Sequence, residues 1–391
     1  MKFDFSFSHL PDLHFGAGKL NHLPEIISHW GNNILLVTGE NSFSHSVYYE
    51  HLTSRLKTQC ILWRELMIGH EPSPSDIDQG VQLYRDSLPD VVVAIGGGSV
   101  IDAGKALSAM LVSELPIVHY LEQVGDTQPT GKKVPFIAVP TTAGTGSEAT
   151  KNAVISVVGN GGFKSSLRHD NYIPNVAIID PELQLTCPAS LTACSGMDAF
   201  SQLVESYLST NANPMTDTLA LDGIMHIVQS LEELVLCQPT NLLLRSKMAY
   251  AAWLSGITLA NAGLGTVHGF ASSVGATTEI PHGAVCGSLM AETNKITLQE
   301  LKKSNEQGIS LQKYATLGRI IGKYEGKPNY FLAEYFIDYL EQLTEKLKLP
   351  KLGQFGVKGN DLESIASKTS NKNNPVKLSH EQLVKILENR I

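Results

Sequence analysis

The stretch Val91–Ile95 (VVVAI) is the feature that most restricts the fold of this 391-residue chain. It is apolar at every position, so neither of its faces can lie against water, which is typical of a strand in a parallel sheet covered on both sides. Three more runs have the same character: Asn33–Thr38, Phe136–Val139 and Val176–Ile179. A helical pattern over Asp76–Leu88 precedes one of them. This βαβ alternation predicts a doubly wound α/β domain of the kind that binds nucleotides.

After Asp180-Pro181 the pattern changes, because apolar residues recur at helical spacing and no strand-like run appears. Long helices are expected over Pro214–Leu236, Leu242–Ala262, Leu311–Ile321 and Tyr330–Leu347. We therefore expect an α/β N-terminal dinucleotide-binding domain with a parallel sheet over residues 1–185. An all-α C-terminal domain should follow over residues 186–391.

The composition argues against several classes of function. Lys and Arg number 30 against 38 Asp and Glu, and a net charge of −8 disfavours nucleic acid or an anionic membrane as a partner. No apolar run reaches the roughly 18 residues of a membrane span, and the N-terminus lacks the apolar block of a secretory signal. The five cysteines form no C-x-x-C pair, so we expect all five to be buried, small hydrophobic residues in a reducing cytoplasm.

Two loops of small residues follow predicted strands. Gly96–Ser99 lies between the strand Val91–Ile95 and a helix expected over Val100–Met110. Without Cβ atoms its backbone can approach a pyrophosphate closely, and the new helix offers free N–H groups. Pro140–Glu148 can add hydroxyl donors at the same sheet edge. The alternative is a pair of plain turns without a ligand, because Ser, Thr and Gly are common in turns.

Three residues of the helical half carry metal-binding groups. Asp198 and His268 are expected near the starts of two helices, and His282 lies in Pro281-His282-Gly283. One carboxylate and two imidazoles suit Fe(II) or Zn(II) with an open coordination position. Each also has a structural alternative, Asp198 as a helix cap and each histidine as a hydrogen-bonded core or surface residue. Chain order alone does not bring the three together.

The motifs GGGSVIDAGKA, PTTAGTGSEAT, DPEL, GMDAFSQLVE and VHGFASSVGATTEIPHGAVC stand in this order, and NPVKLSHEQLVKIL closes the chain. Together they resemble the iron-containing (group III) alcohol dehydrogenases. The resemblance implies a dehydroquinate synthase-like architecture with an active site in the cleft between an α/β and a helical domain. It implies an NAD(P)-dependent, metal-assisted oxidoreductase that interconverts an alcohol and an aldehyde or ketone by hydride transfer. The resemblance also implies a small-molecule substrate, and it allows a homo-oligomer.

Carried over by position, the resemblance places the cofactor on Gly97, Gly98, Ser99, Asp102, Thr141, Thr142, Ser147 and Lys164. It places Fe²⁺ or Zn²⁺ on Asp198, His268 and His282, so that residues 186–391 become the metal and substrate domain, and it makes both histidines catalytic.

Two positions depart from the family pattern. Gln202 stands where a fourth ligand, a histidine, is usual, and Ser272 where a histidine linked to proton relay is usual. We expect Gln202 to be a weak fourth donor or to bind a metal-bound water, because a neutral amide is a poorer ligand than imidazole. Ser272 is a candidate catalytic residue for proton transfer, beside bound water and a cofactor hydroxyl.

Gly39, at the end of the first predicted strand, bears on the choice of cofactor. A carboxylate there would hydrogen-bond the 2′-hydroxyl of NAD and repel the 2′-phosphate of NADP. Its absence predicts that NADP(H) is accepted at least as well as NAD(H), unless Glu40 next to it supplies the carboxylate.

Three alternative functions stay open at this point. A metal-independent reductase of the maleylacetate reductase type is disfavoured by the retention of Asp198, His268 and His282. A dehydroquinate synthase-like lyase is disfavoured by the PTTAGTGSE and PHG strings. A non-catalytic dinucleotide-binding protein is suggested by the changes at Gln202 and Ser272.

Overall fold

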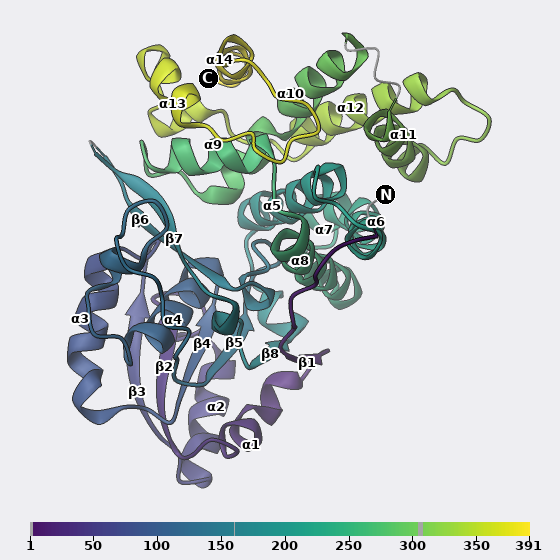
Figure 1. Ribbon diagram of the computed structural model, residues 1–391. Helices are drawn as coiled ribbons and strands as arrows, with labels where there is room; N and C mark the ends of the chain where they lie inside the picture. The colour runs from purple at the N-terminus through teal and green to yellow at the C-terminus, as the bar shows by residue number, and fades with distance from the viewer. Residues whose placement is uncertain (1–2, 160, 304–307) are drawn as a thin grey trace. The chain divides into compact units, whose positions relative to one another are not determined.

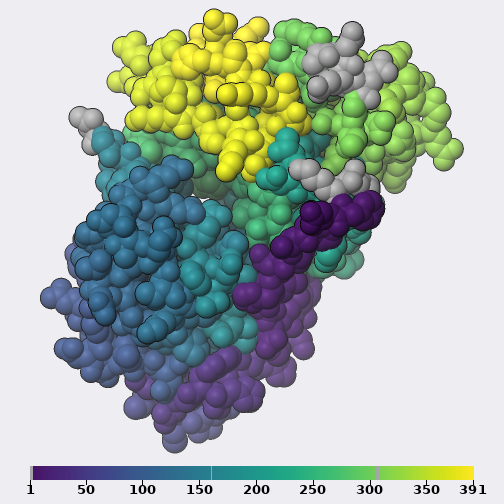
Figure 2. Space-filling model, in the orientation of Figure 1, coloured from purple at the N-terminus to yellow at the C-terminus, as the bar shows by residue number. Residues whose placement is uncertain are grey.

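The computed structural model describes residues 3–159, 161–303 and 308–391, and the chain divides into two compact units. The α/β unit comprises Ser8–Val157 and Lys164–Cys187 (Figure 1). The helical unit comprises Pro188–Ile391 together with Val158–Phe163 and the N-terminal residues up to Phe7. In Figure 2 the C-terminal residues, in yellow, form much of the near surface of the helical unit.

The α/β unit is built on a six-stranded parallel sheet with the order β1-β8-β5-β4-β2-β3. Its strands are β1 (Asp12–Phe15), β2 (Asn33–Gly39), β3 (Leu62–Ile68), β4 (Val91–Gly96), β5 (Phe136–Pro140) and β8 (Val176–Ile179). The predicted parallel α/β domain is confirmed, and all four apolar runs are strands of this sheet. The sequence did not predict β1 and β3, which form its edges, or the separate two-stranded sheet of β6 (Asn152–Val157) and β7 (Phe163–Arg168).

Helices cover both faces of the parallel sheet. They are α1 (Leu23–Ile27), α2 (Val47–Thr58), α3 (Pro74–Tyr84) and α4 (Gly98–Met110). On β4, Val91 and Val93 belong to a core that α1 and α2 complete. On the opposite face a Cβ added to Gly104 of α4 would lie 2.6 Å from the Cβ of Ala94, so the helix rests directly on the strand. Burial on both sides explains why β4, β5 and β8 are apolar along their whole length.

The strand order reverses between β2 and β4. From β2 the chain runs to β3 at one edge, whereas β4, β5 and β8 follow on the other side of β2. The two strands end at the same edge of the sheet, β2 at Gly39 and β4 at Gly96. In open α/β sheets, ligands bind outside the carboxyl ends of the strands at such a switch point. The glycine loop and Gly39 therefore flank the place where this fold binds a ligand.

From Pro188 onward the described residues contain helices and no strand, as the sequence predicts. The α-helices are α5 (Ala189–Leu208), α6 (Pro214–Val228), α7 (Leu231–Leu236), α8 (Leu242–Ala262), α9 (Thr266–Gly275), α10 (His282–Lys303), α11 (Ile309–Gly322), α12 (Asn329–Lys346), α13 (Leu362–Lys368) and α14 (His380–Glu388). The predicted helix Pro214–Leu236 is broken at Gln229-Ser230 into α6 and α7. Within the described ranges, no helix has the length and hydropathy needed to cross a bilayer.

All five cysteines are free thiols, but the expectation that all are buried is wrong. Cys60 and Cys237 are exposed, because each lies in the turn that follows a helix. Cys187 and Cys194 are partly buried, and Cys286 is fully buried within α10.

Candidate metal centre and cofactor loops

The two small-residue loops of the α/β unit lie against each other. β4 and β5 are neighbours in the sheet, and the backbone N–H of Thr141 donates to the carbonyl oxygen of Gly96 (2.9 Å). A Cβ added to Gly98 would lie 2.6 Å from the side chain of Thr145. Helix α4 begins at Gly98 with no side chain capping its first N–H groups. The N-terminus of α4 therefore offers free donors and the positive end of a helix dipole, which is a suitable site for a pyrophosphate.

Asp102 and Ser147, both predicted to contact the cofactor, contact each other. The Ser147 hydroxyl donates to Oδ1 of Asp102, and the backbone N–H of Val154 donates to Oδ2 (3.0 Å). Each Asp102 carboxylate oxygen thus accepts a hydrogen bond from the protein. This residue ties the second loop to α4.

The sequence analysis did not single out Lys105, which holds the same loop from inside. Its ammonium group is buried and donates to the carbonyl oxygens of Ser147 (2.7 Å) and Asn152 (2.8 Å), and to the hydroxyls of Ser147 (3.1 Å) and Thr150 (3.0 Å). Burial lowers the pKa of Lys105 to about 8, although nearby carboxylates raise it. Burial likewise raises the pKa of Glu148 to about 7. The place of Lys105 within the motif GGGSVIDAGKA, on the helix that follows the glycine loop, was the available signal.

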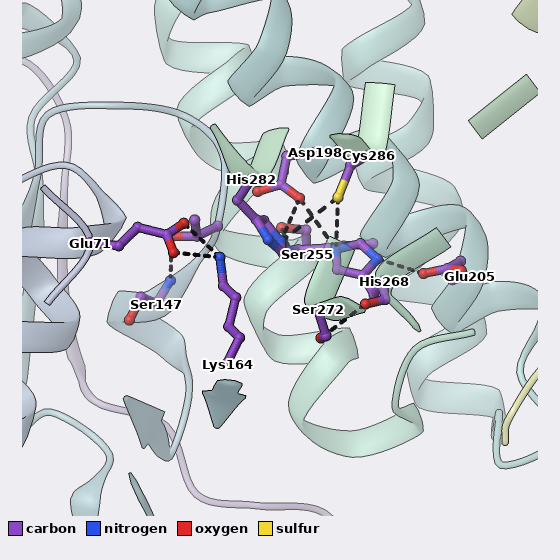
Figure 3. A network of polar contacts seen from close by, with 12 residues as sticks. Glu71, Ser147, Lys164, Asp198, Glu205, Ser255, His268, Ser272, His282 and Cys286 are labelled. Carbon is purple, nitrogen blue, oxygen red and sulfur yellow. Dashed lines mark hydrogen bonds and ion pairs between the residues drawn. The ribbon is translucent and has the colours of Figure 1, made fainter. Parts of the chain in front are cut away.

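Lys164, the remaining predicted cofactor residue, is engaged by a carboxylate. Its Nζ lies 2.5 and 2.7 Å from the two carboxylate oxygens of Glu71, and its side chain is 6% exposed (Figure 3). Ser156 donates to the same carboxylate (2.8 Å). No motif in the sequence predicted that Glu71 lies here.

Gly39 has room for a side chain. An added Cβ would lie 3.7 Å from Val100 and 4.0 Å from the carbonyl oxygen of Ile68, both ordinary contacts. The Glu40 carboxylate lies over Gly69, where an added Cβ would be 2.4 Å from its Cδ. Glu40 is therefore directed toward the end of β3.

In the helical unit, Asp198, His268 and His282 converge as a metal site requires. The Nε2 atoms of His268 and His282 lie 3.2 and 3.6 Å from Oδ1 of Asp198. Cys286 joins them, with its Sγ 3.7 Å from each of these nitrogens. The four donor atoms all lie within 4.8 Å of one another, and Figure 3 shows the side chains directed toward a common point. This donor set fits a divalent transition metal.

Close helix packing brings these side chains together. Asp198 lies in the middle of α5 and not near its start, so the helix-cap alternative is wrong. Helix α10 approaches α5 through glycines: an added Cβ at Gly283 would lie 2.5 Å from the carbonyl oxygen of Cys194, and one at Gly287 would lie 3.1 Å from Met197. Larger residues would hold α10 away. His282 begins α10 and His268 lies in the first turn of α9, as expected for the latter.

Glu205 orients one of the candidate ligands. Its carboxylate accepts from the backbone N–H of Val267 (2.6 Å) and lies 2.6 Å from Nδ1 of His268. A proton on Nδ1 leaves the Nε2 lone pair directed at the cluster, which is the common carboxylate–histidine–metal arrangement. Glu205 stands seven residues after Asp198, two turns along α5, and closes the motif GMDAFSQLVE.

The local charges favour cation binding. Burial raises the pKa of Asp198, but the imidazoles of His282 and His268 outweigh that effect and lower it overall. Burial lowers the pKa of His268, but Cys286 and Glu205 raise it well above its ordinary value. Burial raises the pKa of the Cys286 thiol to about 12. Two acidic side chains thus face the histidines in a site nearly closed to water, which a bound cation would stabilise.

The two residues that depart from the family pattern lie beside this cluster. Gln202 is buried on α5, and its Oε1 accepts from the Ser255 hydroxyl of α8 (2.7 Å). Ser272 is exposed on α9, one turn after His268, and donates to the His268 carbonyl oxygen (3.1 Å). Neither contact shows a role in binding or catalysis.

Comparison with known proteins identifies the chain. The family model described as iron-containing alcohol dehydrogenase matches residues 11–181, and the C-terminal model of the Fe-containing alcohol dehydrogenase family matches residues 192–391. The chain belongs to the iron-containing alcohol dehydrogenase family. It is therefore an oxidoreductase that uses NAD(P) and Fe²⁺ to interconvert an alcohol and an aldehyde or ketone by hydride transfer. The predicted family, enzyme class and cofactors are confirmed.

Members of the family from several organisms align over most of the chain. The NADPH-dependent butanol dehydrogenase of Clostridium saccharobutylicum is 30% identical over 96% of this chain and 95% of its own length. The 1,3-propanediol dehydrogenase of Citrobacter freundii is 33% identical over 81% of each. The solved alcohol dehydrogenase of Oenococcus oeni is 30% identical, covers 99% of this chain and 100% of its own, and superposes with a TM-score of 0.87.

Proposed function

We propose that Asp198, His268 and His282 hold the divalent ion of this dehydrogenase and that the substrate oxygen binds beside it. The observation that carries the proposal is the convergence of three donors from three helices on a nearly buried point, with both histidine Nε2 atoms near Asp198 Oδ1. A bound Fe²⁺ or Zn²⁺ would supply Lewis acidity to the substrate oxygen.

The surrounding residues prepare this site. Glu205 holds a proton of His268 on Nδ1, so that Nε2 is the nitrogen that can lose its proton and donate its electron pair to the metal. Asp198 supplies negative charge and is 2% exposed, where it interacts more strongly with a cation than it would in water. With its side chain only 10% exposed, His268 also helps to keep bulk water from the reacting groups.

The α/β unit binds NAD(P) through the two loops at its switch point. The free N–H groups of Gly98 and Ser99 at the start of α4 bind the pyrophosphate. The second loop places Thr141 and Thr142 beside it, and Lys105 fixes the shape of that loop from below. Lys164, the other predicted cofactor contact, forms an ion pair with Glu71 at this unit.

Ser272 is our candidate for passing the reaction's proton to solvent. Its hydroxyl is exposed and lies one helical turn after His268. The hydroxyl oxygen can accept a hydrogen bond from the proton donor, and its own hydrogen, now bound to the His268 carbonyl oxygen, would turn to a water molecule as the proton is passed on. We also place the protein in the cytoplasm, with residues 1–185 as the cofactor domain and 186–391 as the metal and substrate domain.

The test combines chelation with a substrate panel. The purified protein is dialysed against a chelator, reloaded with Fe(II) or Zn(II), and assayed with butanol, 1,3-propanediol and their aldehydes by the absorbance of NAD(P)H. Activity should vanish on chelation and return with metal, and His268→Ala and His282→Ala should abolish it. Full activity after chelation would establish the metal-independent reductase instead. Cofactor binding without turnover of any substrate would establish a non-catalytic binding protein.

A further inference from the structure

Cys286 occupies the position that Gln202 was expected to fill. Its side chain is fully buried, and its sulfur faces the nitrogens of both candidate histidine ligands. Building on the proposed metal site, we propose that Cys286 is a thiolate ligand of the metal and supplies its fourth protein donor, so that the substrate oxygen would bind as a fifth ligand. Binding forms a metal–sulfur bond, and the thiol proton leaves to solvent.

The distances match a tetrahedral ligand set. With metal bonds of about 2.0 Å to nitrogen and oxygen and about 2.3 Å to sulfur, a tetrahedron has edges of about 3.3 Å between nitrogen and oxygen and about 3.5 Å between nitrogen and sulfur. The two nitrogen–oxygen distances to Asp198 are 3.2 and 3.6 Å, and both nitrogen–sulfur distances to Cys286 are 3.7 Å. Four of the six edges are therefore close to those of a tetrahedral site, and the remaining two lie within 4.8 Å.

Gln202 has a different partner. It follows Asp198 by one turn of α5, but its amide oxygen accepts from the Ser255 hydroxyl of α8, and both side chains are buried. To bind the metal through this oxygen, Gln202 would exchange a buried hydrogen bond for a weak neutral ligand. Cys286, one turn after His282 on α10, reaches the same centre from the opposite helix.

A thiolate ligand changes the charge of the donor set and its preference among metals. The ligand set Asp198, His268, His282 and Cys286 carries two negative charges, whereas an aspartate with three neutral imidazoles carries one. Thiolate is also a softer donor than imidazole and is a common ligand of Zn(II). We therefore expect this centre to hold Zn(II) and Co(II) firmly and to show spectroscopic signs of sulfur ligation.

Cobalt substitution tests the ligand directly. The Co(II)-loaded wild-type protein should show a sulfur-to-cobalt charge-transfer band in the near ultraviolet. Cys286→Ser should lose the band and bind Zn(II) at least tenfold more weakly in a chelator competition. Cys194→Ser is the matched control, because this partly buried cysteine of α5 is outside the donor group. It should keep the band, and so should Gln202→Ala.

A measurement on the wild-type protein avoids dependence on the folding of any variant. X-ray absorption of the Zn(II)-loaded protein should show one sulfur at about 2.3 Å. Stoichiometric Zn(II) with nitrogen and oxygen neighbours alone would overturn the Cys286 proposal and leave the metal site standing. A protein that binds neither Zn(II) nor Co(II), or that binds them equally well after His268→Ala, would instead overturn the metal site of the proposed function.

Discussion

At the scale of single residues, Gly39 offers a test of cofactor choice. Gly39→Asp places a carboxylate at the end of β2 with no steric conflict, because the added Cβ has only ordinary contacts. The carboxylate should repel the 2′-phosphate of NADP and bind the ribose 2′-hydroxyl of NAD. We expect the ratio of NADPH to NADH affinity to fall at least tenfold, about 1.4 kcal/mol, in competitive titrations of both reduced cofactors.

Glu40→Gln is the control for that prediction. Its carboxylate lies over Gly69, so neutralising it should leave the ratio nearly unchanged. The contrary outcome has two parts: the wild-type protein prefers NADH tenfold, and Glu40→Gln loses that preference. It would show that Glu40 supplies the carboxylate that binds the ribose 2′-hydroxyl of NAD.

Glu205 supports a second prediction at this scale. In Glu205→Gln the amide oxygen can still accept from Val267, but it no longer offers a charged acceptor to His268. Loss of such an orienting carboxylate typically costs 10- to 100-fold in metal affinity, roughly. Zn(II) affinity measured by chelator competition should fall by that factor, while the far-ultraviolet circular dichroism stays the same. Unchanged affinity would mean that His268 is oriented by its packing alone.

The sequence identified some site residues and missed others for physical reasons. Asp198, His268 and His282 were predicted as ligands because carboxylate and imidazole groups suit such metals and because the motifs that carry them resemble those of the family. Cys286 was read as a core residue, since a lone cysteine is usually one. Cys286 follows His282 by four residues, a spacing that puts two side chains on the same face of a helix. The sequence did not show that both residues belong to one helix, and the structure does, because α10 begins at His282.

At the scale of secondary-structure elements, the contact of α10 with α5 determines the geometry of the candidate metal centre. Gly283→Ala would place a Cβ 2.5 Å from the backbone carbonyl oxygen of Cys194, and backbone cannot yield as a side chain can. We expect a loss of about 1–3 kcal/mol in the free energy of unfolding and a clear loss of metal affinity. Urea denaturation and metal titration measure the two effects.

Gly359→Ala is its matched control. No atom lies within 4 Å of a Cβ at this position, so stability and metal binding should hardly change. If Gly283→Ala behaved like Gly359→Ala, α10 would have to move away from α5 without cost, contrary to the packing described above.

Elements with both ends marked in the sequence were predicted best. Helix α8 spans Leu242–Ala262 as expected, because Asn241 caps its start and Gly263 follows its end with a φ of 71°. Strand β3, with Arg64 and Glu65 at its centre, was missed because it lies at the sheet edge and alternates weakly in burial. A continuous apolar run indicates a strand that is buried on both faces. An edge strand is only partly buried, so its composition differs little from that of a loop or a surface helix.

At the scale of the whole molecule, Glu148 links stability to pH. Its pKa in the folded protein is raised to about 7 from an ordinary 4.5. Between these values the folded state holds a proton that the unfolded chain has released, so this stabilisation is present at low pH and is lost as the pH rises through 7. Glu148→Gln cannot titrate there. Relative to wild type, the variant should therefore gain about 2–3 kcal/mol between about pH 5 and pH 8.

Urea denaturation of both proteins at the two pH values measures this difference. Lys105 is present in both proteins, but Glu148 raises its pKa, so the measured difference belongs to the coupled pair. A stability difference that is the same at both pH values would mean that Glu148 keeps an ordinary pKa in the folded protein.

The four-residue steps on α5 and α10 have a consequence for how such a site can evolve. Gln202 stands one turn after Asp198 on α5, and Cys286 stands one turn after His282 on α10. With the cysteine as a ligand, the fourth donor can come from either helix on an unchanged backbone. A lineage can then gain a fourth donor on one helix before it loses the fourth donor on the other helix. Every ancestor between the two ligand sets keeps a functional metal centre. Such redundancy lets ligand chemistry drift between imidazole and thiolate through single substitutions, without a non-functional intermediate.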